Sequence, residues 1–147
     1  MNNELKKMYQ KIVMKNYKNP SNLGITEGLI KSEYKNPSCG DEAYVGFSIE
    51  NNIITVLAQE VVGCSICKAS ASVLTKELVN KSVVEALSLI DTFKKLVSGE
   101  NDLDLDSLGE AAFFVGVKEF PARRNCAVLS WKALELGLNN YLNDESI

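Results

Sequence analysis

The stretch AYVGFSIENNIITVLAQE, residues 43–60, contains two β-rich runs separated by a pair of asparagines. Both runs are rich in β-branched and aromatic residues, which favour strands. The dipeptide Asn51-Asn52 readily adopts the positive φ angles of a two-residue hairpin turn. We therefore predict strands at 43–50 and 53–60, joined as an antiparallel hairpin, and a further strand near 28–32.

Helical patterns lie on both sides of this predicted hairpin. Apolar residues at helical spacing predict a helix over 3–18, which Asn19-Pro20 should end. Ser82, with Glu85 three residues later, has the pattern of a capping box at the start of another helix. Two more helices are expected, at about 65–79 and about 122–138. This order predicts an α+β fold, in which helices pack on one face of a small three-stranded antiparallel sheet.

The length of 147 residues suits one domain over 1–147, with a polar tail from about 139. The acidic segment 100–110, with interleaved leucines, is predicted to be a surface excursion with a short helical turn. Its charges are expected to be solvated. The pattern of residues 111–120 does not distinguish helix from strand.

Charge and composition exclude several classes of function. The net charge of −3 disfavours binding to nucleic acid or to an anionic membrane surface. The apolar runs are too short to span a bilayer, and polar residues interrupt every apolar stretch near the N-terminus, unlike in a signal peptide. We therefore expect a cytoplasmic protein. The absence of histidine excludes Ser–His and Cys–His catalytic pairs and any zinc site that needs imidazole.

Three motifs place cysteines where a thiolate is favoured. In Cys39-Gly40-Asp41 the glycine lets the backbone turn, so that a thiol and a carboxylate can face one point. Cys64 follows Gly63 at the predicted start of a helix, where unpaired N–H groups and the helix dipole lower a thiol pKa. The third motif, Arg123-Arg124-Asn125-Cys126, puts two cations beside a thiol.

Together these motifs supply the usual number of ligands for a tetrahedral zinc ion. The predicted ligands are Cys39, Asp41, Cys64 and Cys126. The same thiolate-rich set also suits an iron–sulfur cluster, so ligand chemistry alone leaves both open. Arg123 and Arg124 are candidates for balancing the negative charge of the site or for contacting a partner.

Cys67 has a different interpretation. The sequence Cys64-Ser65-Ile66-Cys67 matches a redox or half-zinc spacing, but a single CxxC motif is weak evidence. If a helix begins at Ser65, Cys67 lies on its first turn. We interpret Cys67 as a packing residue, with a fifth ligand or an accessory resolving thiol as the alternative.

The motifs NPSCGD at 36–41, GCSICKASASVLT at 63–75 and FPARRNCAVLSWKAL at 120–134 resemble the signatures of the U-type iron–sulfur assembly proteins, IscU and SufU. The resemblance extends from the N-terminal helix to about residue 138. It favours the SufU branch, because Asn125 stands where IscU proteins have histidine and Pro121-Ala122-Arg123 replaces their chaperone-recognition motif. The segment 100–110 also resembles the insertion of SufU proteins, whereas Cys67 departs from the small residue usual there.

This resemblance implies a fold like that of IscU and SufE, and a zinc site at Cys39, Asp41, Cys64 and Cys126. It further implies a sulfurtransferase that accepts persulfide sulfur from a PLP-dependent cysteine desulfurase of the SufS type. Cys39 would be the sulfur acceptor, and a downstream Suf-type scaffold would receive the sulfur. Two alternatives stay open: a scaffold that carries an iron–sulfur cluster, and a purely structural zinc module.

Overall fold

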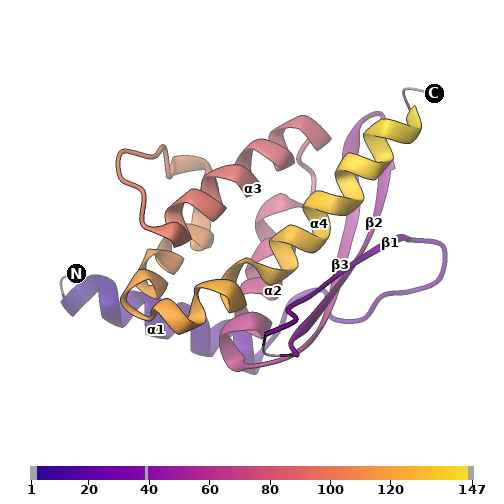
Figure 1. The fold of residues 1–147 in the computed structure, drawn as a ribbon. Coiled ribbons are helices and arrows are strands. Elements are labelled where there is room, and N and C mark those ends of the chain that lie inside the picture. The colour runs from indigo at the N-terminus through magenta and orange to yellow at the C-terminus, as the bar shows by residue number, and fades with distance from the viewer. Residues whose placement is uncertain (1–2, 39, 146–147) are drawn as a thin grey trace.

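A three-stranded antiparallel sheet of order β1-β2-β3 forms one layer of the computed structural model, which describes residues 3–38 and 40–145 (Figure 1). Its strands are β1 (Ile30–Lys35), β2 (Glu42–Glu50) and β3 (Ile53–Val62). Asn51 and Asn52 have φ angles of 52° and 64°, as a type I′ turn requires. The predicted hairpin is confirmed, and β1 begins two residues later than the start we predicted.

The helices follow the predicted order. Their bounds are α1 (Asn3–Lys18), α2 (Ser65–Leu78), α3 (Val83–Ser98) and α4 (Arg124–Glu145), with 3₁₀ segments η1 (Asp106–Glu119) and η2 (Pro121–Arg123) before α4. The Ser82 hydroxyl accepts a hydrogen bond of 3.0 Å from the Glu85 N–H, so the predicted N-cap of α3 is confirmed.

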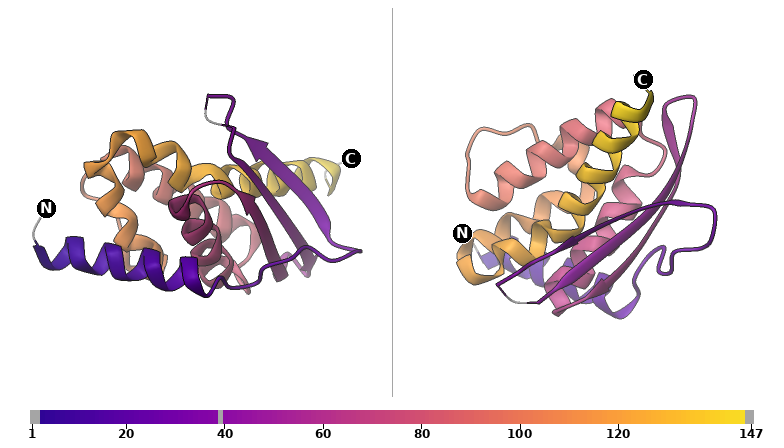
Figure 2. Two further views of the ribbon diagram at one scale, coloured as in Figure 1. Left: turned by 90° about the horizontal axis from the view of Figure 1, so that it is seen from below. Right: turned by 45° about the vertical axis from the view of Figure 1, so that its right-hand side comes forward.

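The helices lie on one face of the sheet, as the sequence predicted (Figures 1 and 2). α2 packs against β3, and α4 packs against β1 and β2, so these two helices form the layer next to the sheet. α1, α3 and η1 pack on the outer side of that layer. The fold is therefore α+β, and α2 contacts both the sheet and the outer helices.

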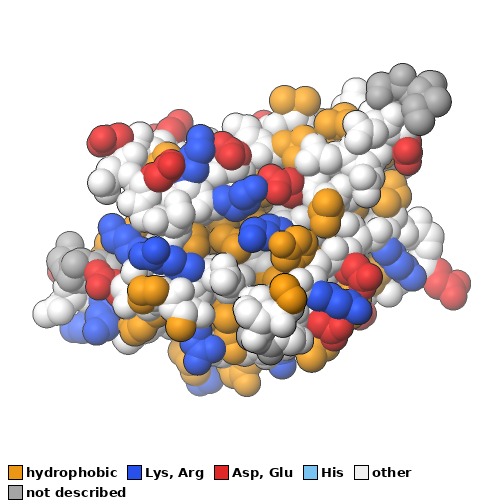
Figure 3. All heavy atoms as spheres, in the orientation of Figure 1, with side chains coloured by type: hydrophobic (Ala, Val, Ile, Leu, Met, Phe, Trp, Pro, Cys, Tyr) orange, Lys and Arg blue, Asp and Glu red, His pale blue; other side chains and the backbone are white. Residues whose placement is uncertain are grey.

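The surface carries charges of both signs. On the face drawn in Figure 3, lysine and arginine side chains are interspersed with acidic ones and with hydrophobic patches. Across residues 3–38 and 40–145, no helix combines the length and the apolar character that a bilayer crossing needs.

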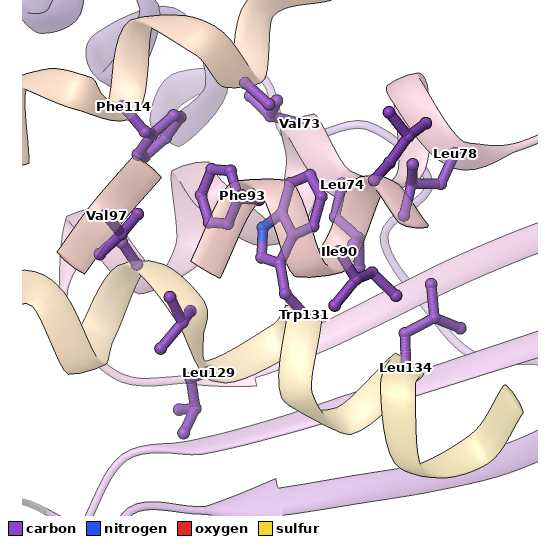
Figure 4. Packing of buried hydrophobic residues seen from close by; sticks show 14 of the residues in the cluster. Val73, Leu74, Leu78, Ile90, Phe93, Val97, Phe114, Leu129, Trp131 and Leu134 are labelled. Atoms are coloured by element: carbon purple, nitrogen blue, oxygen red, sulfur yellow. The ribbon is translucent and has the colours of Figure 1, made fainter. Parts of the chain in front are cut away.

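Aromatic rings fill the space between α3, α4 and η1 (Figure 4). The rings of Phe93 and Trp131 stack with centroids 3.9 Å apart, and Phe114 meets Phe93 edge-on at 5.8 Å. The buried indole N–H of Trp131 donates to the Ser70 hydroxyl at 2.9 Å. This bond satisfies a donor that would otherwise be buried without a partner, at a cost of about 1–3 kcal/mol.

Two parts of the chain differ from the predictions. α4 continues to Glu145 instead of ending near 138, because Tyr141 and Leu142 pack against the core and extend its buried face. The unassigned residues 111–120 belong mostly to η1, whose Ala111, Phe114 and Val117 are buried. Within the acidic segment, Glu110 is ion-paired with Lys15 and Lys76, so the prediction of solvated charges was wrong for this residue.

Candidate metal centre

The register of the sheet brings two of the sequence motifs together. Glu42, at the start of β2, pairs with Val62, at the end of β3. The residues just outside this pair, Asp41 and Gly63, therefore lie side by side. A Cβ atom on Gly63 would be 3.0 Å from the carboxyl carbon of Asp41, so glycine leaves the space that this carboxylate occupies.

A tight loop holds Asp41 in place. The Asn36 N–H donates to the Asp41 carbonyl oxygen at 2.9 Å, and the Gly40 N–H donates to the Asn36 carbonyl oxygen at 2.9 Å. Gly40 has a φ angle of +78°, which residues with a Cβ atom rarely adopt. The predicted turn is thus the β1–β2 connection. Cys39, predicted as a ligand and as the sulfur acceptor, lies outside the described residues.

The other cysteines come from the first turns of two helices. Cys64 is the N-cap residue of α2 and Cys67 lies on the first turn of the same helix, whereas Cys126 is on the first turn of α4. Each helix therefore directs the positive end of its dipole toward the sulfur atoms, and this favours thiolate. All three cysteines are free thiols.

These side chains converge on one point, and we call Asp41, Cys64, Cys67 and Cys126 the thiol cluster. Their ligand atoms, one per residue, all lie within 4.8 Å of one another. The thiol of Cys67 donates to Oδ2 of Asp41 at 3.1 Å, and the thiol of Cys126 reaches the same oxygen at 3.6 Å. Cys67 and Cys126 are 1% and 5% exposed, so the cluster is mostly shielded from solvent.

The three thiols have very different pKa values because they lie close enough to hydrogen-bond and repel one another. A hydrogen bond from Cys67 lowers the pKa of Cys64 to about 5, against the opposing effect of burial. That same bond, together with burial, raises the pKa of Cys67 well above its ordinary value. Burial and the neighbouring Cys64 raise the pKa of Cys126 to about 11. Without a cation, the cluster therefore carries one stable thiolate.

The donor set fits a soft divalent cation. Three sulfur atoms and a carboxylate oxygen are a zinc-type set, and an ideal tetrahedral site places sulfur and oxygen ligands about 3.6 Å apart. The two sulfur–oxygen distances in the cluster, 3.1 and 3.6 Å, are close to this spacing. A bound cation would also stabilise the second and third thiolates, which the protein alone disfavours.

The structure gives the two predicted arginines different surroundings. The exposed Arg123 hydrogen-bonds Cys126, and this bond and the nearby Cys64 raise the pKa of the Arg123 guanidinium. Arg124 is half-buried, and its guanidinium donates to the Lys118 carbonyl oxygen at 3.1 Å. Arg123 is therefore the arginine beside the thiol cluster, whereas Arg124 contacts the end of η1.

From the sequence, Cys67 is predicted to be a packing residue, with a fifth ligand or a resolving thiol as the alternative. The structure places its side chain in the core and its sulfur in the thiol cluster. The signal available in the sequence was the two-residue spacing from Cys64 at the start of a helix. That spacing could not show which face of the helix would meet Asp41.

Comparison with known proteins agrees with this geometry. Residues 8–127 match the family model of the NifU-like N-terminal domain. The chain is 38% identical to the zinc-dependent sulfurtransferase SufU of Bacillus subtilis, with 93% of each chain covered. It is 32% identical to the iron–sulfur cluster assembly scaffold protein IscU of Streptococcus pyogenes, covering 98% of this chain and 91% of that one.

A solved structure has the same fold as this chain. The crystal structure of a protein from Fervidobacterium islandicum, described as an iron–sulfur cluster assembly scaffold protein for the SUF system, superposes with a TM-score of 0.83. It is 32% identical to this chain, and the match covers 90% of this chain and 97% of that one. The chain therefore belongs to the family of the NifU-like N-terminal domain, which includes the IscU and SufU proteins.

Proposed function

We propose that this protein is a cytoplasmic, zinc-dependent sulfurtransferase for iron–sulfur cluster assembly. It would accept persulfide sulfur from a SufS-like, PLP-dependent cysteine desulfurase and pass the sulfur to a downstream Suf-type scaffold. The observation that carries this proposal is the convergence of three free thiols and one carboxylate within 4.8 Å. The similarity to a zinc-dependent sulfurtransferase favours transfer over a merely structural site.

The proposed ligands are Cys39, Asp41, Cys64 and Cys126, as the family resemblance implies. Zinc, when bound, supplies the positive charge that keeps several neighbouring thiols ionised and shields them from oxidation. Asp41 contributes a hard oxygen ligand, and its Oδ2 already contacts the sulfur atoms of Cys67 and Cys126 at 3.1 and 3.6 Å. Arg123 adds a positive charge at the exposed side of the cluster, where it offsets the excess negative charge of the ligands.

Cys39 is the proposed sulfur acceptor. Its thiolate attacks the terminal sulfur of the persulfide on the desulfurase. A new S–S bond forms at Cys39 while the S–S bond of the donor breaks, and the donor cysteine leaves as a thiolate. The terminal sulfur keeps its proton, so no oxidant or reductant is consumed.

Persulfide formation tests this proposal. The zinc-loaded protein is mixed with a SufS-type desulfurase and cysteine, and persulfide is mapped by mass spectrometry while desulfurase turnover is followed. We expect turnover to rise and persulfide to appear on Cys39. Cys39→Ser should abolish both effects, and Ser38→Ala, a change at the adjacent residue, should preserve them. Full sulfur acceptance by Cys39→Ser would contradict the proposal.

A second candidate function is an iron–sulfur cluster scaffold. Three sulfur ligands suit a cluster as well as zinc, and a relative from Streptococcus pyogenes is named as a scaffold. The two functions differ in what the protein carries after anaerobic purification. About one zinc per chain and no visible absorbance support the sulfurtransferase, whereas iron, sulfide and visible absorbance support the scaffold.

A further inference from the structure

We propose that Cys67 is a ligand of the same metal, so that Asp41, Cys64, Cys67 and Cys126 hold the ion when Cys39 leaves it. This inference rests on the proposed function and goes beyond it. It gives the protein five candidate ligands for an ion that takes four. Cys67 would take over the ligand position of Cys39, and the metal would stay bound while Cys39 carries sulfur.

The position of Cys67 on α2 is the first support. Cys64 is the N-cap residue and Cys67 lies one turn further, so both sulfur atoms project from the same end of the helix. Two intervening residues are the spacing that zinc sites use when two cysteines chelate one ion. The two sulfur atoms are within 4.8 Å of each other, so the pair can supply two ligands from one end of α2.

The contacts of Cys67 are the second support. A cysteine that serves only for packing would direct its sulfur at apolar neighbours. Here the buried sulfur hydrogen-bonds Oδ2 of Asp41 at 3.1 Å, close to the spacing of two ligands on one zinc ion. The oxygen that it contacts is also the one contacted by Cys126. Cys67 thus shares its polar partner with a predicted ligand.

The composition of the set is the third support. Among the described residues, the thiol cluster supplies four ligand atoms, three of sulfur and one of oxygen, which is the number that a zinc ion takes. Three thiolates, one carboxylate and Zn²⁺ sum to a charge of −2, the same as for the set that contains Cys39. Exchange of Cys39 for Cys67 therefore leaves the charge of the site unchanged, provided that the proton of Cys67 leaves as Cys39 is released.

Zinc content after gel filtration tests this inference without any sulfur transfer. Four proteins are compared: wild type, Cys39→Ser, Cys67→Ser and the double variant. We expect each single variant to keep about one zinc per chain, with an affinity within about tenfold of wild type. The double variant should lose at least about 100-fold in affinity, measured by competition with a chromophoric chelator. Zinc loss from Cys39→Ser as complete as from the double variant would overturn the inference, as would zinc retention by the double variant.

X-ray absorption at the zinc edge gives a second readout. In Cys39→Ser we expect three sulfur ligands and one oxygen ligand, and two sulfur ligands would overturn the inference. Cys39→Ala, which has no hydroxyl to replace the lost sulfur, should give the same result. Persulfide on a residue other than Cys39 would refute the proposed acceptor, but it would leave the ligand count as an independent result.

Discussion

Two clusters of polar side chains contact helix α2. They differ in how far their acidic groups have hydrogen-bond and ion-pair partners within the protein. At the N-terminal end of α2 lies the thiol cluster, where two thiols share one oxygen of Asp41. Further along the helix, a second group ties α2 to α1 and η1. We call it the Glu110 cluster, and its members are Lys15, Asn16, Ser72, Lys76 and Glu110.

In the Glu110 cluster the half-buried carboxylate has its partners within the protein. The Glu110 carboxylate accepts from Lys15 at 2.8 Å, from Lys76 at 2.7 Å and from Asn16 at 3.1 Å. Burial opposes ionisation, but these donors outweigh it and lower the pKa of Glu110 to about 2. The thiol cluster has three thiols and one carboxylate in a similar space, and of these thiols only Cys64 has a lowered pKa. Ionisation of its other two thiols would therefore need a cation from outside the chain, whereas the Glu110 carboxylate is stabilised by side chains of the protein itself.

Removal of the metal should lower the free energy of unfolding more than the loss of the Glu110 ion pairs does. A ligand that binds only the folded state stabilises it by about 4 kcal/mol when its free concentration is about 1,000 times the Kd. We expect a strong chelator to lower the free energy of unfolding of the zinc-loaded protein by about this amount, measured by urea denaturation. Glu110→Gln should lose the same increment on chelation, because the two clusters are separate. Stability that does not respond to the chelator would contradict a metal in the thiol cluster.

Thiol reactivity in the zinc-free protein should differ by about tenfold or more within the cluster. The pKa of Cys64 near 5 makes it a thiolate at neutral pH, whereas the pKa of Cys126 near 11 keeps it protonated. The lower intrinsic nucleophilicity of a low-pKa thiolate offsets part of this difference. We expect iodoacetamide to label Cys64 before Cys67 and Cys126, as measured by peptide mass spectrometry.

The lowered pKa of Cys64 determines how its labelling should depend on pH. Labelling of Cys64 should be nearly constant from about pH 6 to about pH 8 and should fall about tenfold per unit below about pH 5, because only the thiolate reacts. An ordinary thiol would instead show a tenfold rise per unit through the neutral range. Such a rise for Cys64 would contradict the shared hydrogen bonds of the cluster.

The same contrast explains what could be predicted from the sequence. Asp41, Cys64 and Cys126 each lie at the start of a strand or helix, and local motifs mark such positions. The partners of Glu110 do not, since Lys15 and Lys76 are 95 and 34 residues away and meet it only when η1 packs on α1 and α2. Cys67 combines both situations. Its position on the first turn of α2 can be predicted from the local sequence, but its contact with Asp41 depends on tertiary packing.

Glu110→Gln should have a moderate effect on stability. The amide cannot pair with Lys15 and Lys76 as the carboxylate does, although the variant relieves the repulsion between Glu110 and the nearby Glu77. We expect a loss of about 1–2 kcal/mol in the free energy of unfolding at neutral pH, allowing for partial exposure of the cluster. Asp91→Asn is the matched control, since Asp91 forms an exposed i,i+4 pair with Lys95. That control should cost less than about 0.5 kcal/mol. Equal losses in the two variants would contradict a structural role for the Glu110 cluster.

The difference in stability between the wild type and Glu110→Gln should also depend on pH, and this dependence is the smallest effect that we expect. The pKa of Glu110 is about 2 in the folded state, compared with an ordinary value of 4.5. A lowered pKa contributes stability that is complete above the ordinary value and is lost as the pH falls toward the folded value. The advantage of the wild type over Glu110→Gln should therefore be constant above about pH 6 and should fall by more than half near pH 3. Urea denaturation at each pH measures it, and Glu77, present in both proteins, contributes to both curves. An advantage that stayed constant down to about pH 3 would mean that the lysines stabilise Glu110 by packing rather than by charge.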